Sequence, residues 1–229
     1  QTEYDNPMER RHFSQTNSCP DCGVKLSIWT KGDEEGVMAE ERILPAVLKA
    51  WDEGKIIAIK GIGGFLLTCD AENPSAVQLI RQRKQRPTKP FAVMYPSLLG
   101  LEVEDDERSL WEGSVSPIVL TPRSDSMKLA KGVADGLSEV GIMIPYAPLF
   151  EWLLDAFQKP VIATSGNISH SPIIYQDENM GMLWEVADYV LTNDRDIVVP
   201  QDDSVIRISP TYRQQIIIRR SRGLAPNYF

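Results

Sequence analysis

Short apolar runs of strand length, interleaved with segments of helical character, constrain the fold of this chain more than any other feature. The expected strands occupy residues 55–60, 65–69, 91–95, 117–120, 140–144, 161–164, 189–191, 204–208 and 216–219. The expected helices occupy 43–53, 74–86, 148–157 and 177–187. Because strands and helices do not alternate as strictly as in a doubly wound sheet, we expect an α/β (α+β) fold with a twisted mixed β-sheet flanked by helices.

Caps and turns support these boundaries. Asn73 and Pro74 form a good helix start, with Asn as the cap and Pro at the first helical position. Gly54 follows the helix predicted at 43–53, and glycine is favoured just past a helix end. A glycine turn, Gly61 to Gly64, separates two expected strands. The glycines of this turn are explained equally well by a tight reversal of the chain and by close approach of a ligand to the backbone.

Composition limits the classes of partner. The chain of 229 residues carries a net charge of −8, which argues against a general nucleic-acid binder. No apolar run approaches the length of a membrane span, and no N-terminal segment resembles a signal peptide. We therefore expect a cytoplasmic protein without a membrane partner. Residues 1–6 are polar and lack a starting Met, so they look like the cut end of a longer chain.

The N-terminal part differs from the rest of the chain. Cys19 and Cys22 form a Cys-x-x-Cys-Gly knuckle, a spacing that places two thiolates on one Zn²⁺. His12 and Cys69 are poor candidates to complete the site, so we expect the other ligands to lie upstream of residue 1. We assign 1–30 to the remnant of a zinc module, 31–36 to a polar linker and 37–229 to the main domain.

A basic run stands out in this acidic chain, with cations at Arg81, Arg83, Lys84, Arg86 and Lys89. Complementing the macrodipole at a helix C-terminus explains one or two of these charges. The others lead directly into an apolar strand. Arg and Lys converging there are typical of a polyphosphate site, and we favour that interpretation.

The segment Thr164-Ser165-Gly166-Asn167 ends a strand with a hydroxyl, a flexible glycine and an amide. Such a turn is suited to small-ligand binding, although it can also simply close a strand. It is not a nucleophile elbow, because Ala163 and Asn167 stand where that motif needs glycines.

The C-terminal region adds further charges. Asp202 and Asp203 could hold Mg²⁺ with substrate phosphates, but a capping role is the default interpretation for such a pair. Arg207 lies in an expected strand, and the arginines at 219, 220 and 222 follow another. Because these three follow a buried strand rather than a mobile tail, they indicate anion binding.

Taken in order, these motifs resemble HypF-type carbamoyltransferases of hydrogenase maturation. The resemblance rests on segments 6–12, 19–23, 60–65, 69–71, 83–94, 143–149, 164–167, 202–205 and 220–226. It implies the end of a second zinc module followed by a YrdC-like ATP-binding adenylation domain. One departure is Leu66, where this family usually has a histidine. Another is Gly166, where alanine or serine is commoner.

The resemblance also implies a reaction: carbamoyl phosphate, or carbamate derived from it, reacts with ATP and Mg²⁺ to give carbamoyl-adenylate. In the full-length enzyme, which also holds Zn²⁺, the carbamoyl group would pass to a cysteine of a partner maturation protein. The implied catalytic residues are Lys84 and Arg86. The other implied ATP- and phosphate-binding residues are Lys60, Lys89, Ser165, Asn167, Arg207, Arg220 and Arg222.

Two alternatives remain open from the sequence. Threonylcarbamoyl-adenylate synthesis for tRNA modification shares the Lys-x-Arg and Ser-x-Asn motifs. A non-catalytic RNA-binding module would use the same basic concavity. The acidic net charge and the absence of interleaved surface aromatics disfavour RNA binding.

Overall fold

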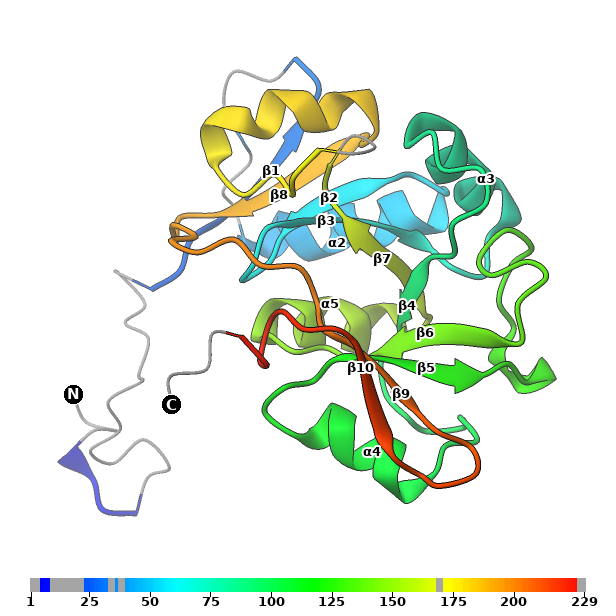
Figure 1. Ribbon diagram of the computed structural model, residues 1–229. Helices are drawn as coiled ribbons and strands as arrows, with labels where there is room; N and C mark the ends of the chain where they lie inside the picture. Colours follow the sequence, from blue (N-terminus) through cyan, green and yellow to red (C-terminus); the bar gives the residue numbers. More distant parts are fainter. Residues whose placement is uncertain (1–4, 9–22, 33–35, 37–39, 168–170, 226–229) are drawn as a thin grey trace.

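A computed structural model describes residues 5–8, 23–32, 36, 40–167 and 171–225. A single mixed sheet of ten strands runs through the molecule, from β1 and β8 at the top of Figure 1 to β9 and β10 at the bottom. The strand order is β1-β8-β2-β3-β7-β4-β6-β5-β9-β10. The strands are β1 (Leu26–Thr30), β2 (Ile57–Lys60), β3 (Phe65–Asp70), β4 (Ala92–Met94), β5 (Ile118–Pro122), β6 (Glu139–Met143), β7 (Val161–Ser165), β8 (Tyr189–Asn193), β9 (Val205–Ile208) and β10 (Gln215–Arg219).

Three strand pairs are parallel, β2–β8, β4–β6 and β5–β9, and the other neighbours are antiparallel. The predicted mixed sheet is therefore confirmed. Each strand expected from the sequence is present, with ends shifted by a few residues. The strand that precedes the arginines was expected to be buried, but β10 is an exposed strand at the edge of the sheet.

Helices cover both faces of the sheet. The α-helices are α2 (Glu40–Asp52), α3 (Pro74–Arg83), α4 (Asp105–Glu112) and α5 (Pro148–Phe157), and the 3₁₀ helices are η1 (Asp125–Met127) and η2 (Asp177–Glu185). Residues of α3, α4 and η2 pack into one apolar core, and residues of α2 and α5 pack into a second. Successive residues of a strand enter different cores: Ala58 belongs to the first, whereas Ile57 and Ile59 belong to the second.

Two differences from the expected elements have local causes. The predicted helix at 177–187 is the 3₁₀ helix η2, and Gly181 in its middle disfavours an α-helix by about 1 kcal/mol. Helix α4 was not predicted; its start is fixed by reciprocal capping between Glu104 and Glu107. The three N-terminal residues of α4, Asp105 to Glu107, are acidic and complement the helix dipole.

Strand β1 lies within the segment assigned to the zinc module. It pairs antiparallel with β8 over its whole length, and the Trp29 indole donates to Thr192 Oγ1 at 3.1 Å. Residues 26–30 are therefore part of the sheet. Within the described part of the chain, no helix is both long and apolar enough to cross a membrane.

Candidate functional site

A cavity of about 610 Å³ lies on one face of the sheet, the face that α2 and α5 cover only in part. Its walls come from the strands between β3 and β10 and from the loop that precedes β4. The lining residues that carry the argument are Leu66, Arg86, Lys89, Ser165, Asp202, Arg207 and Arg219.

The floor of the cavity is hollow because its central strands carry small residues. Ala92, Gly141 and Ala163 occupy neighbouring positions on β4, β6 and β7. A methyl group at Gly141 would lie 2.8 Å from Ile118 Cγ2, so glycine allows the side chain of Ile118 to lie over β6. Small residues on the floor and larger ones around it create room for a ligand.

Arg86 forms the centre of the basic wall. Its guanidinium donates to the carbonyl oxygens of Lys89 and Pro90 and, at 3.4 Å, to Thr164 Oγ1. Burial, together with the nearby charges of Arg81 and Arg219, lowers the pKa of Arg86 to about 10. Neighbouring cations destabilise one another's charged forms. An anionic ligand between them offsets this repulsion, so such a cluster favours anion binding.

Lys84 lies behind this wall and is buried, with 4% of its surface exposed. Its ammonium donates to the Ser165 carbonyl at 2.6 Å and to the carbonyl and side-chain oxygens of Asn167 at 2.9 and 2.7 Å. Burial and the neighbouring charges of Arg86 and Lys89 lower its pKa to about 8. Lys84 thus holds the Ser165–Asn167 turn, and Asn167 itself does not line the cavity.

The Ser165–Asn167 turn is fixed by backbone contacts as well. Gly166 donates to the Phe65 carbonyl at 2.5 Å, Ile174 donates to the Gly166 carbonyl at 2.8 Å, and Phe65 donates to the Ile174 carbonyl at 2.8 Å. These three bonds join Phe65, Gly166 and Ile174 to one another. Ser165 Oγ donates to Asn167 Oδ1 at 2.9 Å, so the two polar side chains of the turn are oriented together.

Carboxylates balance part of the positive charge around the cavity. Arg207 pairs with Glu139, and Arg219 lies 3.9 Å from Asp202. Among the described residues, Arg207 Nε is a buried donor without an acceptor. A buried N–H without a partner costs about 1–3 kcal/mol.

Arg222 has a structural role. Its guanidinium donates to Asp203 at 2.9 Å and to the Val115 and Ser116 carbonyls at 3.1 and 2.8 Å, and it lies 3.8 Å from the centre of the Tyr146 ring. Burial raises the pKa of the Asp203 carboxyl, although Arg222 acts in the opposite direction. Neither Arg222 nor Arg220, which donates to the Leu224 carbonyl, lines the cavity.

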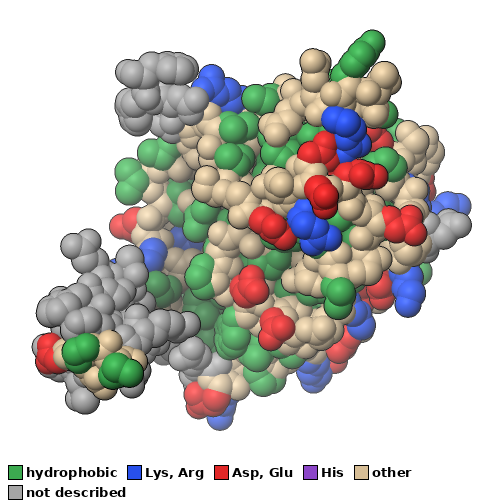
Figure 2. Space-filling view, turned by 90° about the horizontal axis from the view of Figure 1, so that it is seen from below, with side chains coloured by type: hydrophobic (Ala, Val, Ile, Leu, Met, Phe, Trp, Pro, Cys, Tyr) green, Lys and Arg blue, Asp and Glu red, His purple; other side chains and the backbone are tan. Residues whose placement is uncertain are grey.

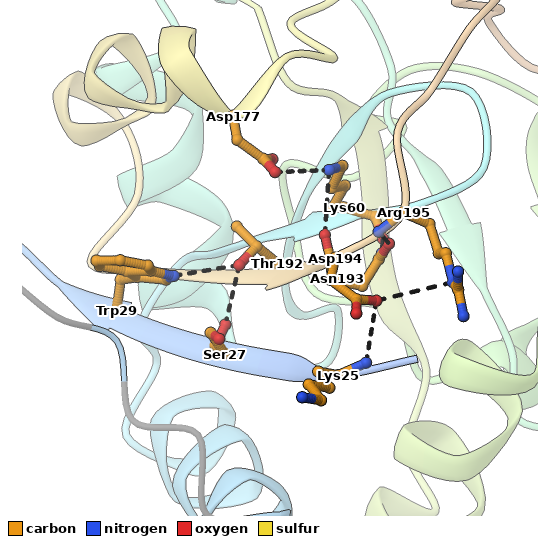
Figure 3. Close-up of polar contacts among 9 residues, drawn as sticks. All are labelled: Lys25, Ser27, Trp29, Lys60, Asp177, Thr192, Asn193, Asp194 and Arg195. Carbon is orange, nitrogen blue, oxygen red and sulfur yellow. Dashed lines mark hydrogen bonds and ion pairs between the residues drawn. The ribbon is translucent and has the colours of Figure 1, made fainter. Parts of the chain in front are cut away.

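Lys60 also lies outside the cavity, at the end of β2. Figure 3 shows its ammonium between Asp177, which reaches it from η2, and the end of β8. The distances are 2.8 Å to Asp177 Oδ2 and 3.1 Å to the Asn193 carbonyl. Of the residues expected from the sequence, the structure thus brings Arg86, Lys89, Ser165 and Arg207 together around the cavity.

Arg219 lines the cavity. The arginine-rich segment indicated anion binding by Arg219, but the family resemblance implied no ATP-binding role for it. A bulge explains its position: Ile217 pairs with Ile206 and Arg219 with Val205, so one extra residue of β10 lies between them. Ile218 and Arg219 consequently both face the cavity, which strict alternation would prevent. The repeated arginines are a usable signal in the sequence, but the bulge is not visible there.

The proposed zinc ligands Cys19 and Cys22 lie outside the described residues. Among the residues that are described, no group of three or more His, Cys, Asp or Glu side chains could hold a metal ion.

Comparisons with known proteins give the family. A family model described as "Telomere recombination", that of Sua5, YciO and YrdC, matches residues 49–221. A second model, "HypF finger", matches residues 1–29. The threonylcarbamoyl-AMP synthase of Vibrio campbellii is 31% identical over 138 residues, which cover 55% of this chain and 72% of that protein.

Similarity to HypF extends over nearly the whole chain. Carbamoyltransferase HypF of Rhodobacter capsulatus is 41% identical over 235 residues, covering 98% of this chain and 30% of that protein. A crystal structure of full-length HypF in a phosphate- and nucleotide-bound form superposes with a TM-score of 0.84 at 41% identity, covering 98% of this chain and 29% of that one. The chain spans about 30% of the length of these relatives. It belongs to the Sua5/YciO/YrdC family, in the form that occurs within HypF-type carbamoyltransferases.

Proposed function

We propose that the cavity binds ATP and catalyses the formation of carbamoyl-adenylate. The observation that carries this proposal is the convergence of Arg86, Lys89, Arg207 and Arg219 on one cavity of about 610 Å³. Ser165 lies on the same wall, at the turn held by Lys84. A site of this size with several cations suits a nucleoside triphosphate.

In the proposed reaction, a carbamate oxygen attacks the α-phosphorus of ATP. The new O–P bond forms as the bond to the β-phosphate oxygen breaks, and pyrophosphate leaves with the electron pair. The protein supplies positioning and charge neutralisation rather than a covalent nucleophile. Arg86, Lys89 and Arg207 would bind the phosphates, and the Ser165–Asn167 turn would hold the adenylate.

Mg²⁺ would accompany ATP in this site. Asp202 lines the cavity, its side chain is 45% exposed, and among the described residues its carboxylate forms one long ion pair, with Arg219. A carboxylate of this kind, together with water and phosphate oxygens, is the ligand set that Mg²⁺ prefers. Asp203 is unsuited to the role because Arg222 already occupies it.

Further steps would involve parts of a longer protein. The adenylate would pass to another domain and then to a cysteine thiol of a partner maturation protein. Cys19 and Cys22 would contribute to a Zn²⁺ site, and the enzyme would work in the cytoplasm. RNA binding is not favoured: on the face shown in Figure 2, basic side chains are interspersed with acidic ones.

Isotope exchange between pyrophosphate and ATP tests the proposal with the purified chain and Mg²⁺. Separate reactions receive carbamoyl phosphate, ammonium carbamate, or threonine with bicarbonate. We expect exchange with carbamate, and with carbamoyl phosphate as it releases carbamate. Exchange only with threonine and bicarbonate would assign the chain to the tRNA-modification reaction. No exchange in any reaction, with ATP binding intact, would overturn adenylate formation by this chain.

A further inference from the structure

Lys60 carries a buried charge that the proposed ATP site does not contact. Only 2% of its side chain is exposed, and its ammonium is engaged by Asp177 and by the Asn193 carbonyl. The Asn193 side chain in turn donates to the Lys60 carbonyl at 3.1 Å. Lys60 therefore joins the ends of two parallel strands, β2 and β8, to the first residue of η2 (Figure 3).

The segment leading into η2 contacts the Ser165–Asn167 turn directly. Asn167 Nδ2 donates to the Ser171 carbonyl at 2.5 Å, and Ile174 bonds to both Gly166 and Phe65. A methyl group at Gly64 would lie 2.5 Å from Ile173 Cδ1, so the segment packs closely on the turn before β3 as well. Any displacement of residues 171–177 would therefore be transmitted to the turn.

Separate anchors hold the two ends of η2. Near its C-terminal end, Leu183 is buried and Arg83 donates to the Val186 carbonyl at 2.8 Å. At the N-terminal end, the capping position Gln176 makes no side-chain capping bond. The ion pair of Lys60 with Asp177 fixes this end.

We propose that Lys60 is a positioning residue for adenylate formation. Its ion pair with Asp177 holds residues 171–177 against Gly166 and thereby sets the geometry of Ser165 and Asn167 in the ATP site. This inference rests on the proposed function for its catalytic consequence. It differs from the expectation that Lys60 contacts substrate. If Lys60 acts through Asp177, loss of Asp177 should lower activity as much as loss of Lys60.

A double-mutant cycle separates the two roles. The variants are Lys60→Met, Asp177→Asn and the double variant, measured by pyrophosphate exchange. If Lys60 acts through Asp177, each single variant lowers kcat about tenfold or more, and the double variant is no worse than either. KM for ATP stays within about threefold, since the phosphate-binding residues are unchanged. Asp177→Glu, which keeps the carboxylate, should recover part of the rate.

Hydrogen exchange gives a readout that does not need catalysis. Backbone amides of residues 171–177 should exchange faster in Lys60→Met and in Asp177→Asn than in the unaltered chain. The matched control is Lys49→Met, which removes an ion pair between two exposed side chains, with Glu53 at 3.7 Å. This control should leave both the exchange of the segment and kcat unchanged.

Two results would overturn the inference. One is an Asp177→Asn variant with full activity beside an inactive Lys60→Met variant, which would make Lys60 a substrate-binding cation. The other is unchanged amide exchange of residues 171–177 in both single variants. If the unaltered chain shows no pyrophosphate exchange with any substrate, the proposed function fails, while the hydrogen-exchange comparison still decides whether Lys60 holds the segment.

Discussion

Gly166→Ala adds one methyl group at the point where the turn of the proposed ATP site meets β3. An ideal Cβ at this position would lie 2.7 Å from both Cβ and the carbonyl oxygen of Phe65. Carbon atoms normally pack at about 3.5–4.0 Å, so the shortfall is roughly 0.8 Å. Rotation of the Phe65 ring cannot relieve it, because both contacts involve Cβ and the backbone of a central strand.

The magnitude follows from three contributions. Overpacking of this kind costs about 1–3 kcal/mol. Weakening of the bond from Gly166 to the Phe65 carbonyl adds about 1 kcal/mol. The lower entropy of the unfolded chain with alanine returns about 0.4–1 kcal/mol. We expect a net loss of roughly 1–3.6 kcal/mol, which lowers the Tm by about 2–14 °C in a domain of this size.

Urea and thermal unfolding of the two proteins measure this loss. Gly181→Ala is the matched control, because no atom lies within 4 Å of its Cβ position and the site is exposed. Pyrophosphate exchange should also fall in Gly166→Ala, since displacement of the turn moves Ser165. Equal stability of the two variants would refute the reasoning.

Three further predictions concern charged groups. Arg86→Ala should weaken ATP binding at least tenfold by calorimetry, whereas Arg108→Ala, on the exposed face of α4, should not; an unchanged affinity for ATP in Arg86→Ala would contradict its assignment. Arg222→Met should cost about 3–5 kcal/mol in urea unfolding because it leaves Asp203 buried without a partner, and Arg222→Met with Asp203→Asn should recover much of this loss. The pKa of Lys84 is about 8 in the folded protein and 10.5 ordinarily, so between these pH values the unfolded state binds more protons. The free energy of unfolding should therefore rise with pH by up to about 1.4 kcal/mol per pH unit in this range. A Lys84→Met variant should lose this rise, and an equal slope in both proteins would exclude Lys84 as its source.

The fold was predictable because the strands carry the information locally. Ile57, Ala58 and Ile59 are buried on both faces of the sheet, and a continuous apolar run of this kind is what a central strand requires. Strand β1 lacks such a run and owes its place to pairing with β8, which lies far away in the sequence. The alternation of apolar and polar residues from Val24 to Ile28 is a local signal for a half-buried strand, but it does not show which strand β1 pairs with.

The site was predictable only in part, for a related reason. Charge and motif order identify Arg86 and Lys89 as candidates, and both line the cavity. The sequence cannot distinguish a cation that faces a ligand from one that the protein itself satisfies. Lys84 and Arg222 belong to the second kind, since carbonyl and side-chain oxygens of the protein surround them.

This distinction indicates which basic groups would contact phosphate. A cation that is bonded to protein acceptors and does not line the cavity, such as Lys84 or Arg222, reaches a ligand there only if those bonds are broken, whereas Arg86 lines the cavity although it too donates to protein oxygens. Arg207 differs, because it lines the cavity and, among the described residues, its side chain is held by one ion pair, with Glu139. The pair holds the side chain at the cavity wall, where 42% of it is exposed. The exposed part of the Arg207 side chain is therefore held in place before a ligand binds, as preorganised recognition requires.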